Sequence, residues 1–97
     1  MHVGSCVLVF RLRGNDSLKG KRQIARSLIA QLRQKFNLSV AEVESMDDHQ
    51  RLVIGMACVS NSPGHAEEML DKAVRLAESQ RFDAELIQAE RDLLEAG

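Results

Sequence analysis

The segment Ser17–Phe36 constrains the fold most, because its apolar residues recur with the period of an α-helix. At about 100° per residue they form one broad stripe along a helix predicted over residues 18–36. The stripe consists of Ile24, Ala25, Leu28, Ile29, Leu32 and Phe36. Ser17 precedes the helix and is expected to cap it, because its hydroxyl can accept a bond from a first-turn N–H group. A helix with one apolar side must cover another layer of structure.

The segments around this helix carry β-strand patterns. Strands predicted over residues 2–13 and 50–61 have apolar residues on both faces, which is typical of central strands. A strand predicted over residues 38–45 alternates polar and apolar residues, which favours a half-exposed edge strand. A second amphipathic helix is predicted over residues 63–80.

The C-terminal segment allows two interpretations. Good helix formers run through residues 82–97, so local propensity favours a continued helix. A fourth strand over residues 82–91 is the other interpretation, and we expect it because four strands cover two helices better than three.

The order of these elements predicts a single domain over residues 1–97. The first crossover should be right-handed and should leave a gap between the first two strands, which the third strand fills as a hairpin partner of the second. The predicted fold is therefore α+β and ferredoxin-like (βαββαβ). It has a four-stranded antiparallel sheet in the order 4-1-3-2 with both helices on one face.

Charge is distributed unevenly, although the net charge is only −1. Residues 1–37 hold eight Lys or Arg and one acidic residue, which gives +7. Residues 38–97 hold five Lys or Arg and thirteen acidic residues, which gives −8. Such polarity can steer an anionic partner to one face. The alternative is that the two halves neutralise each other within the fold.

Cations of the first helix form a candidate anion site. Arg22, Arg26 and Arg33 lie within about 40° of one another on the helical wheel, on one flank of the apolar stripe. Lys19 and Lys21 lie in the first turn, near the unpaired N–H groups and the positive end of the helix dipole. Lys21 points into the apolar arc, so we expect its ammonium to extend beyond the helix end. These five residues are the predicted nucleic-acid-binding residues. The alternative is an ordinary amphipathic helix with a solvated basic flank.

Enzymatic activity and cofactors are not expected. Five residues separate Gly14 from Gly20, rather than the four of a Walker A phosphate loop, and Arg22 replaces the Ser or Thr of that motif. The cysteines and histidines show no metal-ligand spacing, and no nucleophile–base set is visible. Two aspartates and a histidine in a hairpin loop at residues 46–50 are expected to be solvated rather than a metal or acid–base site.

The composition favours a cytoplasmic location. No apolar run approaches the roughly 20 residues of a membrane span, and no secretory signal is visible. Cys6 and Cys58 have no close spacing, which suggests reduced thiols. We expect both to be buried as small apolar residues and to lie near each other on neighbouring strands.

Several motifs together resemble the YlxP-like family of small bacterial proteins of unknown function. They are SLKGKR at 17–22, KFNLSVAEV at 35–43, Gln50, IG at 54–55 and VSN at 59–61. The resemblance implies a ferredoxin-like fold and offers no known active site to carry over. Genes of the family lie beside those of translation and ribosome-maturation factors, which implies a link to RNA or the ribosome by association only.

Two non-enzymatic functions follow as expectations. The first is RNA or ribosome binding through the basic edge of the first helix. Base stacking on the sheet is disfavoured, since the chain has no Tyr or Trp and only Phe10 lies in the first three predicted strands. The second is a homo-oligomeric or protein-interaction module without nucleic-acid binding, because both central strands carry apolar residues on the face that the helices leave open. The predicted homodimer interface consists of Val7, Val9, Val53 and Ala57.

Overall fold

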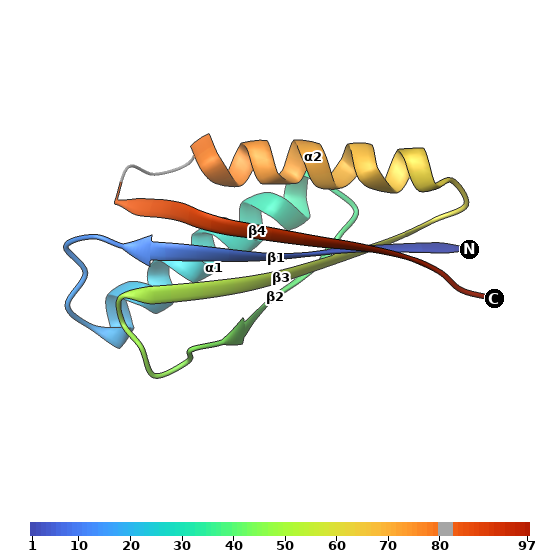
Figure 1. Ribbon diagram of the computed structural model, residues 1–97. Coiled ribbons are helices and arrows are strands. Elements are labelled where there is room, and N and C mark those ends of the chain that lie inside the picture. Colours follow the sequence, from blue (N-terminus) through green and yellow to red (C-terminus); the bar gives the residue numbers. More distant parts are fainter. Residues whose placement is uncertain (80–82) are drawn as a thin grey trace.

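A computed structural model of the chain has four strands in one antiparallel sheet and two helices on one face of it (Figure 1). It describes residues 1–79 and 83–97. The elements are β1 (His2–Leu12), α1 (Leu18–Lys35), β2 (Ser39–Glu44), β3 (Arg51–Ser60), α2 (Pro63–Ser79) and β4 (Ala84–Glu95). The strand order β2-β3-β1-β4 is the predicted order read from the opposite edge of the sheet, so the predicted ferredoxin-like fold is confirmed.

The strand interpretation of the C-terminal segment is correct, and the helical one is wrong. β4 pairs with β1 from Leu12 opposite Ala84 to His2 opposite Glu95, with an irregularity between Val9 and Phe10. The strand is therefore longer than predicted, because backbone pairing with a central strand outweighs helix propensity there. The predicted helix end at residue 80 and strand start at residue 82 lie outside the described residues.

The core lies between the sheet and the two helices. Alternate residues of the central strands face it, and they are Cys6, Leu8, Phe10, Leu12, Leu52, Ile54, Met56 and Cys58. The apolar stripe of α1 packs on them, and so does a matching stripe of α2 that includes Ala66, Leu70 and Ala73. In the described part of the chain neither helix is long and apolar enough to cross a membrane.

Both cysteines are buried free thiols, as expected. Cys6 lies opposite Met56 and Cys58 lies opposite Gly4, so the two cysteines are diagonal rather than direct neighbours across β1 and β3. Burial raises the pKa of the Cys6 thiol, and the positive charge of Arg91 and a backbone hydrogen bond from Glu90 oppose this effect in part. The thiol therefore behaves as part of the apolar core.

Candidate nucleic-acid interface

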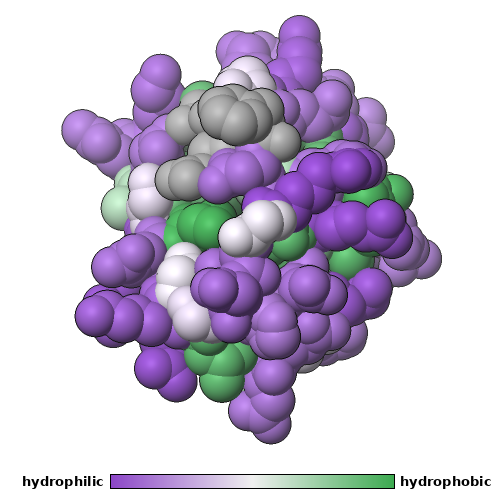
Figure 2. Space-filling model, turned by 90° about the vertical axis from the view of Figure 1, so that its left-hand side faces the viewer, coloured by the Kyte–Doolittle hydropathy of each residue, from purple (hydrophilic) through white to green (hydrophobic). Residues whose placement is uncertain are grey.

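Two loops and the start of α1 meet at one end of the domain, opposite the two chain termini (Figure 1). The loops join β1 to α1 and β2 to β3. Figure 2 looks onto this end and shows a mostly hydrophilic surface with a few apolar patches. We call this end of the domain the loop end. It contains Lys19, Lys21 and Arg22, which the sequence had placed in an anion site.

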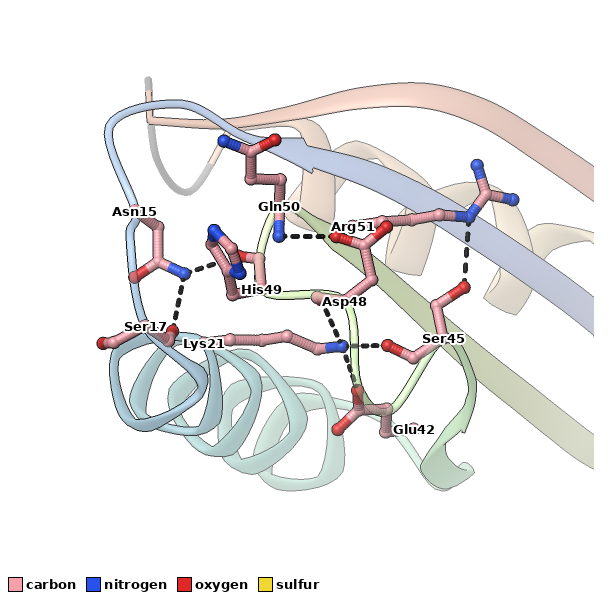
Figure 3. A network of polar contacts seen from close by, with 9 residues as sticks. All are labelled: Asn15, Ser17, Lys21, Glu42, Ser45, Asp48, His49, Gln50 and Arg51. Carbon is pink, nitrogen blue, oxygen red and sulfur yellow. Dashed lines mark hydrogen bonds and ion pairs between the residues drawn. The ribbon is translucent and has the colours of Figure 1, made fainter.

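Lys21 is buried at the loop end, so its ammonium is not free to bind an anion as the predicted site required. The residue is 1 % exposed. Its Nζ donates to the carbonyl oxygens of Ser45 and Asp48, the latter at 2.8 Å (Figure 3). It also lies 3.0 Å from Oε2 of Glu42, in an ion pair. Two of its three N–H donors bond to loop carbonyls and the ammonium is buried beside the Glu42 carboxylate, so Lys21 has no exposed donor to offer a phosphate.

The helical position of Lys21 explains this outcome. It falls inside the apolar stripe of α1, and the methylene stem runs inward with the buried residues of that stripe. The two carbonyl acceptors come from the β2–β3 loop, and Glu42 comes from β2. In that loop Ser45 has a left-handed φ of 59°, and its carbonyl also accepts the N–H of Asp48 at 3.1 Å. One ammonium therefore fastens α1 to a loop that is distant in sequence.

Asn15 and Gly20 hold the β1–α1 loop in place. The Asn15 Nδ2 donates to the carbonyl oxygens of Ser17 at 2.9 Å and of His49 at 2.5 Å, which ties the β1–α1 loop to the β2–β3 loop (Figure 3). A Cβ at residue 20 would overlap Oδ1 of Asn15, so glycine makes room for this amide. Ser17 caps α1 as predicted, with its Oγ accepting the N–H of Gly20 at 3.0 Å.

Lys19, Arg22 and Arg26 are exposed and lie along one side of α1, which we call the basic ridge. Their spacing of three and four residues places them within about 60° on the helical wheel. In residues 1–79 and 83–97, no ion pair links any of the three to an acidic side chain.

Arg33 continues the line of the basic ridge but is already partly engaged. It is exposed, and its Nη2 donates to the carbonyl oxygen of Val40 in the edge strand β2 at 2.7 Å. This contact covers part of an unpaired strand edge. Of the five residues predicted to bind an anion, Lys19, Arg22 and Arg26 are therefore free to do so. Arg33 is partly engaged with Val40, and Lys21 is buried.

The loop at residues 46–50 has a role that the sequence interpretation missed. Asp48 supplies a carbonyl oxygen to Lys21, and its side-chain Oδ1 accepts the backbone N–H of Gln50 at 2.9 Å. The sequence did hold a clue to this role. Lys21 falls on the apolar face of the helix, and a cation there needs polar partners inside the fold.

Comparison with known proteins identifies the family. A family model described as "Protein of unknown function (DUF503)" matches residues 3–91. The chain is also 33 % identical over 63 residues to the "Uncharacterized protein YlxP" of Bacillus subtilis (strain 168), which covers 65 % of this chain and 68 % of that protein. The chain therefore belongs to the DUF503 family, and the resemblance to YlxP-like proteins is confirmed.

We predict that Lys21→Met destabilises the fold by about 3 kcal/mol, because it leaves the Glu42 carboxylate and two loop carbonyls without their cation. Lys19→Met is the matched control, since it removes the same charge from an exposed position two residues away and should cost less than about 0.5 kcal/mol. Urea unfolding followed by circular dichroism measures both. An equal loss of unfolding free energy in the two variants would contradict the structural role of Lys21.

Proposed function

We propose that this member of the DUF503 family is a non-enzymatic RNA-binding protein and that the basic ridge of α1 contacts the RNA. One observation carries the proposal. Over its 18 residues α1 contains no acidic side chain, while Lys19, Arg22 and Arg26 are exposed on one side and unpaired with acids in the described chain. A surface of one charge sign attracts an anionic polymer.

The second helix shows what an ordinary solvated surface looks like in this protein. The exposed side of α2 mixes acidic and basic residues, and Lys72 pairs with Glu68 one turn earlier at 2.9 Å. Mixed signs are typical of a surface that serves solubility. The uniform charge of α1 therefore supports a binding role over a merely solvated basic flank.

The contacts in this proposal are to phosphates rather than to bases. Phe10 is buried in the core and Phe36 packs against it, so neither offers an exposed ring for stacking. Lys and Arg contacts to the backbone would supply the affinity, with little dependence on sequence. The gene neighbourhood implied by the family resemblance favours ribosomal RNA as the partner.

We predict that the double variant Arg22→Gln/Arg26→Gln binds a labelled single-stranded RNA more weakly than the unchanged protein. Each lost phosphate contact on a single strand should reduce the slope of log K against log salt by about 0.7, so two contacts reduce it by about 1.4. Fluorescence anisotropy at several salt concentrations measures both quantities.

The matched control for this experiment is Lys72→Gln/Arg75→Gln, which removes the same charge from the exposed side of α2. It should leave the affinity and the salt slope nearly unchanged. The proposal fails if both double variants weaken binding equally, because the effect would then reflect net charge, or if the unchanged protein binds no RNA.

A second candidate function, homodimerisation, is favoured by the open face of the sheet. Val59 and Leu94 are 63 % and 59 % exposed, and both lie opposite the half-buried Val3, so the three form an apolar row across three strands. A row of exposed aliphatic side chains is typical of an interaction surface. A second copy of this chain is the partner that we propose for it.

The four residues predicted for this interface lie on the open face but differ in exposure. Val9 and Val53 face each other and are already 5 % and 1 % exposed within one chain, so they add little area to an interface. Val7 and Ala57 are half-buried and line a shallow groove of about 620 Å³. Glu90 and Asp92 of β4 lie opposite Val7 and Ser5, so acidic side chains border the apolar surface on the same face.

We predict that Val59→Lys/Leu94→Lys converts a dimer into a monomer, because two charges would be buried in the apolar row. Sedimentation velocity at micromolar protein concentration measures the oligomeric state. Met46→Lys is the control, since Met46 is also exposed but lies in the loop at the opposite end of the sheet. A monomeric unchanged protein would contradict this candidate.

A further inference from the structure

A recess of about 550 Å³ lies on the open face of the sheet, at the loop end. Arginines line it from two adjacent strands and a loop. Arg11 comes from β1, Arg51 from β3 and Arg13 from the β1–α1 loop. Ile87 of β4 forms part of its wall. None of these arginines belongs to the basic ridge of α1.

Two of the arginines are direct neighbours across strands. The pairing of β1 with β3 places Arg11 opposite Arg51. Both point away from the helices, because Leu12 and Leu52, their neighbours in the strands, face the core. Residues paired in this way have Cβ atoms about 5 Å apart, and like charges in such a pair are unfavourable. The pairing of two arginines is therefore a cost to folding that a bound anion would offset.

Nearby acidic groups leave this pair largely uncompensated. Glu85 lies opposite Arg11 on β4, but its Oε2 accepts two bonds from Arg13, at 3.1 Å from Nε and 2.6 Å from Nη2. Arg51 donates from Nε to the neutral hydroxyl of Ser45 at 3.2 Å. In the described chain neither Arg11 nor Arg51 forms an ion pair with an acid.

Asp48 is the acidic residue that lines the recess together with the three arginines. Its Oδ1 already accepts the backbone N–H of Gln50 at 2.9 Å, and its carbonyl oxygen accepts from Lys21. Together with Glu85, which pairs with Arg13, two negative charges therefore face three positive charges at the recess. An anion entering the recess would relieve the repulsion between the arginines.

We propose that this arginine recess is a phosphate-binding site, in which Arg11 and Arg51 hold one phosphate group between them. Guanidinium groups offer paired N–H donors whose geometry matches phosphate oxygens. Arg13 also lines the recess, but its charge is neutralised by Glu85, so Arg11 and Arg51 are the phosphate ligands of the proposal. The site lies roughly 25 Å along the sheet from Val3, since eight residues of strand separate Val3 from Arg11, so it does not overlap the apolar row.

The recess and the basic ridge are connected around the loop end. Arg13 and Gly14 line the recess and also line a second cavity of about 250 Å³ beside the first turns of α1. Gly20 and Gln23 line that second cavity, and both flank Lys19 of the basic ridge. A strand of RNA bound on the basic ridge would thus continue into the recess, and this path rests on the proposed function. A free phosphate compound would instead bind in the recess alone.

The test is the variant Arg11→Gln/Arg51→Gln, with a labelled single-stranded RNA and with inorganic pyrophosphate as probes. We expect the RNA dissociation constant to rise at least about tenfold at low salt and the salt slope to fall by about 0.7, the value for one phosphate contact. Pyrophosphate binding, measured by calorimetry, should be lost. The control variant Lys72→Gln/Arg75→Gln changes the net charge by the same amount. It should bind RNA and pyrophosphate as the unchanged protein does.

Thermal unfolding guards against a loss of structure, because removing two opposed like charges should leave the melting temperature unchanged or raise it. Arg11→Gln alone is a second variant, which keeps the bond from Arg51 to Ser45. Suppose that the unchanged protein binds pyrophosphate but no RNA, and that the variants do not bind pyrophosphate. The recess is then a site for free phosphate compounds, and the RNA proposal fails. If the variants bind RNA and pyrophosphate as the unchanged protein does, the recess proposal is overturned while the basic ridge is unaffected.

Discussion

The arrangement of the loop end depends on the buried ammonium of Lys21. It joins the first helix to two carbonyl oxygens of the loop between β2 and β3 and to the carboxylate of Glu42 in β2 (Figure 3). Removing a cation from water is costly, so these three oxygens must all be in position when the helix packs. The contact therefore fixes the loop end and, with it, the relative positions of the basic ridge and the arginine recess.

The uneven charge of the chain is neutralised within the fold only in part. Some positive charge of the first 37 residues is neutralised within the fold, since Lys21 pairs with Glu42 and Arg13 pairs with Glu85. Other cations from that segment have no acidic partner in the described chain, including those of the basic ridge and Arg11. The acidic half of the chain thus leaves positive surface on both sides of the loop end.

Hydrophobic periodicity was enough to predict the fold, because the central strands and both helices bury regular stripes. Topology then predicted β4 correctly against the helix propensity of its residues. The site was harder to predict. The inward direction of Lys21 follows from its helical spacing, but its acceptors are backbone carbonyls, which a sequence does not display. The juxtaposition of Arg11 and Arg51 depends on strand register, which residue patterns alone did not give.

We propose that α1 divides its cations between structure and binding, with Lys21 inside and the basic ridge outside. NMR of the lysine ammonium groups, with and without single-stranded RNA, tests this division most directly. We expect the Lys21 ammonium signal to be protected from exchange with water and unmoved by RNA, while the Lys19 side chain exchanges rapidly and shifts on binding. A Lys21 ammonium that exchanges as fast as Lys19 and shifts when RNA is added would contradict the account.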